Sequence, residues 1–196
     1  MIKRRIKKRE EKKTKKRYNI LNIFADIFIR YLLVLLAGLK DLFVFYLIFT
    51  PLTVYPVYFL LSLLYPSTVS GTEILVGDYS IKFIEACVAG SAYYLLFILN
   101  LTTKMELRKR ILSLLYSFFA FLILNIARIF LLSTLFINSN CNFFVFDIIH
   151  KFFWYFLSTI FVVAIWFSEV RIFNIKTIPF YSDLMFFVES IRNQKR

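Results

Sequence analysis

The chain has 196 residues, of which 60% are hydrophobic and 25 are phenylalanine, and its formal net charge is +13. Its apolar stretches are far longer than the core of a soluble domain of this size requires. The composition therefore excludes an ordinary soluble protein and predicts an all-α integral membrane protein.

Residues 1–17 form a basic tail that contains eleven lysines or arginines against Glu10 and Glu11, and so carries +9 of the charge. Because the charge is concentrated in a tail and not spread over a folded face, we interpret the tail as a cytoplasmic anchor attracted to anionic membrane lipid. Binding to RNA or the ribosome is the alternative, and we expect no nucleic-acid partner. The apolar residues after the tail lead to no small-residue cleavage site, so no cleavable signal peptide is expected.

Residues 18–41 are predicted to form an amphipathic helix that lies flat at the membrane interface. On a helical wheel most of their polar residues share one sector, and Asp26 and Arg30 have the i,i+4 spacing of an ion pair. A span that turns this polar stripe into a helix bundle stays open as the alternative. A fifth span here would invert every later segment.

Residues 42–167 are predicted to be the transmembrane core, with spans over 42–65, 81–101, 111–136 and 143–167. Each of them has about the 20 apolar residues that crossing a bilayer requires. Pro51 and Pro56 should kink the first span.

Basic residues in the loops indicate the orientation of these spans. The connection around Met105 contains Lys104, Arg108, Lys109 and Arg110, and the C-terminal segment 168–196 is also basic. The connections 66–85 and 138–142 contain one lysine and no arginine. The positive-inside rule then predicts a multi-pass protein of the cell membrane with a cytoplasmic N-terminus.

Residues 72–84 are predicted to form a short external β-hairpin, since a Gly77-Asp78 turn separates two short strand-like runs. If the second strand runs to Ile84, the next helix begins near Glu85 and Cys87 lies in its first turn, where free N–H groups favour a thiolate. If the helix begins near Ile81 instead, Cys87 lies six residues further down.

Cys87, Arg128 and His150 are the candidate catalytic residues. Each lies in a different apolar segment, and the predicted topology brings all three to a similar depth below the outer face. An ionisable group in hydrocarbon costs roughly 2.5 to 3.5 kcal/mol, so Arg128 and His150 need a partner or a function. A cysteine with one candidate base and a planar guanidinium suits nucleophilic attack on a carbonyl with stabilisation of the oxyanion.

Structural interpretations of the same residues remain open. Cys87 could be a small buried side chain or could form a disulfide with Cys141, and Arg128 could be the counter-ion of Asp147. The protein would then be a non-enzymatic membrane scaffold or assembly factor. The single histidine disfavours a zinc site, and the sequence contains no cofactor-binding motif. A transporter is disfavoured because the sequence shows no internal repeat.

The order Cys, Asn-x-x-Arg and His across late apolar segments resembles the exosortase/archaeosortase family of membrane cysteine transpeptidases, particularly its compact, pacearchaeosortase-like archaeal members. The matching stretches begin at Glu85, Asn125 and Asp147, and the resemblance covers residues 71–167. It implies a nucleophilic Cys87, a catalytic Arg128 and His150 as the third catalytic position, all facing the outside. The implied partners are secreted proteins with a C-terminal motif, a hydrophobic span and a basic tail. The sequence reads Cys-Val-Ala-Gly where the commoner family pattern is Cys-Ser-Gly.

Overall fold

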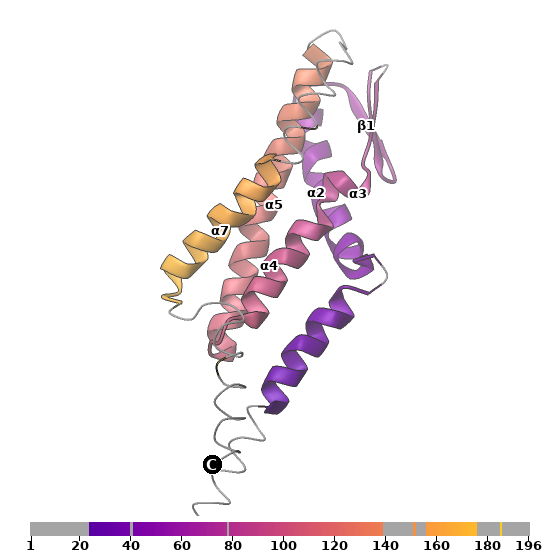
Figure 1. Cartoon of the computed structure of the whole chain (residues 1–196). Helices are drawn as coiled ribbons and strands as arrows, with labels where there is room; N and C mark the ends of the chain where they lie inside the picture. Colours follow the sequence, from indigo (N-terminus) through magenta and orange to yellow (C-terminus); the bar gives the residue numbers. More distant parts are fainter. Residues whose placement is uncertain are drawn as a thin grey trace, which may run out of the picture.

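The computed structural model describes residues 24–39, 41–77, 79–138, 151, 156–175 and 185. Within these ranges the protein is mostly helical and carries one small antiparallel sheet (Figure 1). A first helix covers residues 24–37. It is followed by α2 (Phe43–Ser62), β1 (Ser67–Ser70), β2 (Glu73–Val76), β3 (Tyr79–Lys82), α3 (Glu85–Val88), α4 (Gly90–Thr102), α5 (Leu107–Asn138) and α7 (Ser158–Ile172).

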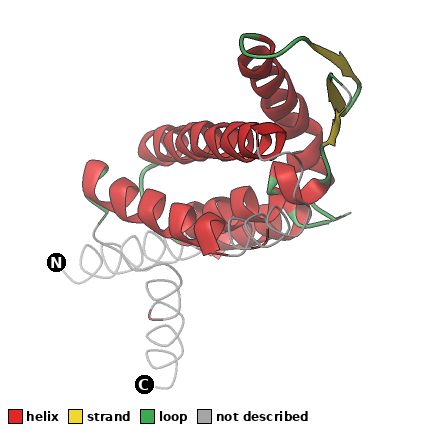
Figure 2. Ribbon diagram, turned by 90° about the horizontal axis from the view of Figure 1, so that it is seen from above, coloured by secondary structure: helices red, strands yellow, loops and turns green. Residues whose placement is uncertain are grey.

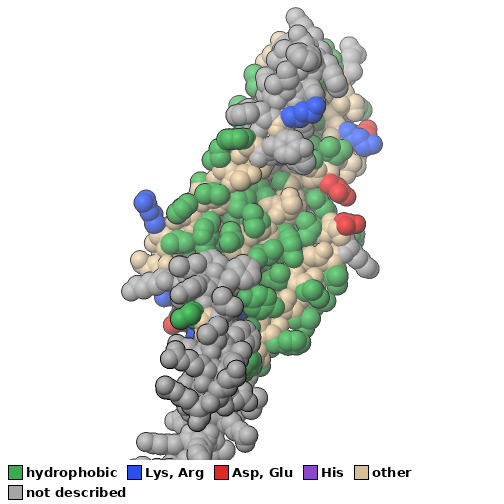
Figure 3. Space-filling view, in the orientation of Figure 1, with side chains coloured by type: hydrophobic (Ala, Val, Ile, Leu, Met, Phe, Trp, Pro, Cys, Tyr) green, Lys and Arg blue, Asp and Glu red, His purple; other side chains and the backbone are tan. Residues whose placement is uncertain are grey.

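Among the described residues two helices, α2 and α5, are long and apolar enough to cross a membrane. The outward face of α5 repeats large apolar residues every four positions, at Ile111, Leu115, Phe119 and Ile123, which are each 51–65% exposed. Apolar side chains cover the middle of the face shown in Figure 3, while charged side chains lie toward its ends and edges. Soluble monomers rarely expose so large an apolar surface, so these helices have the surface of membrane spans as well as the length.

The inward face of α5 is rich in polar residues. Ser113, Ser117, Asn125, Arg128 and Ser133 are buried on this helix, together with the apolar Phe121, Ile129 and Leu132. A helix of a soluble protein places mainly apolar residues toward the core. The many small and polar residues between α5 and its neighbours are typical of helix contacts in membranes.

The predicted span over residues 81–101 is wrong in its first part. Strand β3 runs to Lys82, α3 is a single turn, and the chain breaks at Ala89, where φ is 58°. The 13 residues of α4 extend about 20 Å at 1.5 Å per residue, less than the roughly 30 Å of a hydrocarbon core. Helix α7 has 15 residues, and residues 143–150 of the last predicted span lie outside the described residues. The count of four spans therefore stays a prediction.

The first helix packs against α4. The Tyr94 hydroxyl donates a hydrogen bond to the Val34 carbonyl at 3.1 Å. Gly38 lies so close to the same ring that a Cβ there would be 2.6 Å from the tyrosine oxygen. The prediction of a helix within residues 18–41 is confirmed for 24–37.

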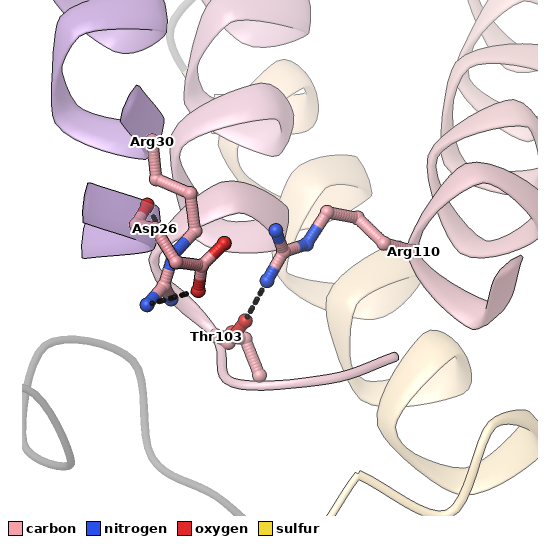
Figure 4. Close-up of polar contacts among 4 residues, drawn as sticks. All are labelled: Asp26, Arg30, Thr103 and Arg110. Carbon is pink, nitrogen blue, oxygen red and sulfur yellow. Dashed lines mark hydrogen bonds and ion pairs between the residues drawn. The ribbon is translucent and has the colours of Figure 1, made fainter. Parts of the chain in front are cut away.

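Part of the polar stripe of this helix turns toward the bundle. Arg30 is 3% exposed and pairs with the exposed Asp26 at 3.1 Å. Figure 4 shows this pair beside the end of α4, where Arg110 of α5 donates to the Thr103 carbonyl at 3.0 Å. The buried arginine matches the alternative interpretation, in which the stripe faces other helices, and the position of this helix in the membrane stays a prediction.

The predicted hairpin is confirmed as β2 and β3, and the structure adds a third strand. The sheet order is β1-β2-β3, and the pairs Val76 with Tyr79 and Ser70 with Glu73 enclose two-residue loops. Gly71 and Gly77 open these loops with φ of 60° and 57°, which glycine adopts at little cost. The sheet stands to one side of the helices (Figure 2).

Two apolar clusters hold the bundle together. One is rich in aromatic residues and joins α2, α4, α5 and α7, with the Phe49 and Tyr93 rings stacked at 3.6 Å between centroids. The other lies under the sheet and joins it to α2 and α5, and its buried members are Val54, Val57, Leu61, Ile74, Val76, Phe83 and Ile129. Cys87 packs against this second cluster, which therefore fixes the sheet beside the candidate nucleophile.

A buried carboxyl group connects three helices near the other end of the bundle. Glu169 of α7 is fully buried. It accepts hydrogen bonds from Asn100 of α4 at 2.7 Å, from Ser117 of α5 at 2.6 Å and from Ser113 of α5. Neutral donors from two helices thus hold the carboxyl group of a third.

Candidate active site

Cys87 lies in the first turn of α3, which begins at Glu85 after an extended Ile84. This confirms the first of the two predicted helix starts, and the start near Ile81 is wrong because β3 occupies those residues. Within the described residues the thiol has no disulfide partner, and it is half-buried. Cys87 thus sits on a single helical turn between a strand and a longer helix.

The end of α3 leaves carbonyl groups without helical partners. Because Ala89 adopts a left-handed conformation, the α-helical hydrogen-bond pattern is interrupted before α4. Asn125 of α5 fills this gap, since its Nδ2 donates to the Cys87 carbonyl at 3.0 Å and to the Val88 carbonyl at 3.4 Å. The backbone of Cys87 is therefore hydrogen-bonded directly to α5.

Arg128, one turn further along α5, holds the same segment. Its Nη2 donates to the carbonyls of Cys87 at 3.3 Å and Ala86 at 3.5 Å, and its Nη1 donates to the Ser158 hydroxyl of α7 at 2.6 Å. The residue is 5% exposed, and its buried Nε has no hydrogen-bond partner among the described residues. Within the described ranges, every hydrogen-bond partner of this cation is neutral.

Cys87 and Arg128 line one cavity of about 320 Å³. Its other walls are the outer strand β3 and the upper part of α5, and its lining residues there are Ser80, Ile81, Lys82, Ile84, Ile129, Leu132, Ser133 and Phe136. The cavity therefore places a thiol and a buried cation together, with mostly apolar walls around them.

The structure thus brings two of the three candidate catalytic residues together. His150 lies outside the described residues, as do Cys141 and Asp147, so the proposed base and both structural alternatives that involve them stay predictions. Among the described residues, no group of three His, Cys, Asp or Glu side chains could hold a metal ion.

Two residues of the site were not predicted to act there. Asn125 belongs to the quoted Asn-x-x-Arg stretch, and its i,i+3 spacing from Arg128 indicates that both side chains share one face of α5. Ser158 carries no such signal, because a serine in an apolar segment is common and only the folded arrangement of α5 and α7 reveals its contact.

The fold and the site define a class: a mostly helical protein in which two of the described helices are long and apolar enough to span a membrane, with a thiol and a buried guanidinium in one cavity. No family model, curated protein or solved structure matches the chain.

Proposed function

We propose that the protein is a membrane-embedded cysteine protease or transpeptidase that cleaves C-terminal sorting signals of secreted proteins at the outer face of the cell membrane. The observation that supports this most strongly is the electrostatics of the cavity. Arg128 is a nearly buried cation whose hydrogen-bond partners, within the described ranges, are all neutral, and it shares the cavity with the Cys87 thiol, which has no disulfide partner in those ranges. A buried cation is costly unless an anion is nearby, and a Cys87 thiolate would be that anion.

In the proposed reaction the Cys87 thiolate attacks the carbonyl carbon of the scissile peptide bond. The tetrahedral intermediate collapses as the C–N bond breaks, which leaves a thioester on Cys87 and releases the C-terminal segment as an amine. His150 would take the thiol proton and return it to the leaving nitrogen, a role that rests on the family resemblance. Water or an acceptor amine or hydroxyl then attacks the thioester and regenerates the thiol.

Arg128 has the donors that such an intermediate needs. Two guanidinium nitrogens hold α3 and Ser158, and the buried Nε–H has no partner in the part of the chain that the structure describes. Donors that are fixed before the reaction stabilise a developing oxyanion without reorganisation. We therefore assign Arg128 two roles, positioning of the Cys87 backbone and stabilisation of the oxyanion.

The test compares Cys87→Ser with Cys141→Ser. Both variants are produced in membranes together with a secreted protein of the same genome that ends in a short motif, a hydrophobic span and a basic tail, and cleavage is followed by the size of that protein. We expect loss of cleavage with Cys87→Ser alone, because an alkoxide is much harder to form at neutral pH than a thiolate.

A non-enzymatic scaffold is the second candidate, since the hydrogen bonds of Arg128 to Ala86, Cys87 and Ser158 would stabilise the fold even without catalysis. It predicts a Cys87–Cys141 disulfide, visible as a mass increase after reduction and alkylation of both thiols. An equal loss of cleavage in the two cysteine variants, together with that disulfide in the wild type, would favour the scaffold and overturn the proposed enzymatic function.

A further inference from the structure

We propose that the free edge of β3 binds the substrate as an additional strand, so that an extended segment of the substrate lies along β3 with its scissile bond at Cys87. This inference rests on the proposed function and specifies how that site holds its substrate. The sheet order is β1-β2-β3, so β3 is an outer strand.

The register shows which backbone groups of β3 point away from β2. In an antiparallel pair, residues alternate between those that exchange hydrogen bonds with the partner strand and those that point away from it. The two-residue loop makes Val76 and Tyr79 a hydrogen-bonded pair, and the Phe83 N–H donates to the Thr72 carbonyl at 2.9 Å in the same alternation. The backbone N–H and C=O groups of Ser80 and Lys82 therefore point toward the free edge.

This edge borders the cavity of the nucleophile. Ser80, Ile81 and Lys82 line it together with Cys87. In the described part of the chain, no backbone hydrogen bond beyond the sheet involves Ser80 or Lys82. An edge strand with unpaired groups is a template for another extended chain.

The occupant that fits is an extended, largely apolar polypeptide segment. Backbone hydrogen bonds to Ser80 and Lys82 would hold it regardless of its sequence, while alternate side chains would face Ile129 and Leu132 of α5 across the cavity. A volume of about 320 Å³ lies at the low end for ligand pockets and suits the few residues around a scissile bond. A carbonyl held this way meets the sulfur of Cys87 and the donors of Arg128.

The test measures alkylation of Cys87 by acetyl-Ala-Ala-Ala chloromethyl ketone, whose chloride is displaced by the Cys87 sulfur to give a thioether. Its analogue with N-methylated amides cannot donate backbone hydrogen bonds, and iodoacetamide reports thiol reactivity alone. We expect wild-type protein to react at least about fivefold faster with the unmethylated peptide than with the methylated one. Iodoacetamide should react equally with all variants.

Two matched variants locate the effect. Ser80→Pro removes an outward N–H from β3 and should abolish the preference for the unmethylated peptide. Ser67→Pro makes the same change on the outer edge of β1, on the opposite side of the sheet, and should retain that preference. Circular dichroism and Cys87 reactivity with iodoacetamide verify that both variants are folded.

Equal rates with the two peptides in wild type would overturn edge binding, as would a preference that survives Ser80→Pro. A wild-type dimer that Ser80→Pro converts to a monomer would assign the edge to a second copy of the chain and would also overturn it. Failure of the proposed function alone would give a different result. Cys87 would show the preference for the unmethylated peptide, but the Cys87→Ser variant would still cleave the secreted substrate.

Discussion

Arg128 contacts two other elements of the bundle, so its substitution separates positioning from chemistry. Arg128→Lys keeps the charge but loses the planar set of donors, and removal of one oxyanion donor typically costs about 10² to 10³ in rate. We expect cleavage to fall by this factor while the amount of detergent-stable protein is unchanged. Ser158→Ala, which removes only the acceptor of Nη1, should reduce cleavage less.

The opposite pattern would count against catalysis by Arg128. Low levels of Arg128→Gln that return to normal in a double variant with Asp147→Asn would identify a buried ion pair, because breaking such a pair from one side costs roughly 3 to 5 kcal/mol. Protein level is measured by quantitative blotting of detergent extracts beside the cleavage assay.

Ala89 adopts a conformation that suits glycine better than alanine, with φ of 58°. The left-handed region costs an L-residue with a Cβ about 1 kcal/mol or more. Ala89→Gly should therefore raise the thermal unfolding temperature in detergent, and the β-branched Ala89→Val should lower it. A lower unfolding temperature for Ala89→Gly would show that the Cβ packing of this residue outweighs the backbone strain.

At the scale of elements, Glu169 connects α4, α5 and α7 by accepting hydrogen bonds from neutral donors. Glu169→Ala would leave Asn100 and Ser113 without their acceptor inside the bundle, at about 1 to 3 kcal/mol for each unsatisfied group, while Ser117 would keep the Ser113 carbonyl as an acceptor. Glu169→Gln keeps the shape and should be milder. The exposed Glu106→Ala is the control, and an equal unfolding temperature for it and Glu169→Ala would contradict this role.

Sequence patterns predicted the elements that depend on local signals. The Gly77 turn and the alternation after it located β2 and β3, and Glu85 was one of two predicted helix starts. Strand β1 was missed because Ser67–Ser70 is short and largely polar and forms only by pairing with β2. The break at Ala89 was also missed, since the preceding residues have the composition of a span and the carbonyls freed there are satisfied by Asn125 from a distant segment.

Part of the candidate site could also be predicted from the sequence. Cys87 and Arg128 stood out as reactive groups in apolar segments, and the structure places both on one cavity. The hydrogen bond from Arg128 to the Cys87 carbonyl could not be predicted from the sequence, because it depends on how α3 and α5 pack.

At the scale of the whole molecule, the sheet and the α4–α5 connection lie at opposite ends of the bundle (Figure 1). The charges of the connections predict that the end with Lys104 is cytoplasmic and the end with the sheet is external. A reporter fused after Lys104 should then be active only in the cytoplasm, and one fused near Thr72 only outside. The reverse activities would place Cys87 inside the cell and exclude secreted substrates.

The attachment of α3 to α5 also has a mechanical consequence. Because α3 is one turn long and its carbonyls are bonded to Asn125 and Arg128, a shift or rotation of α5 would carry the Cys87 backbone with it. The thiol and the guanidinium would keep their spacing, and the sheet, which the second apolar cluster joins to α5, would move with them.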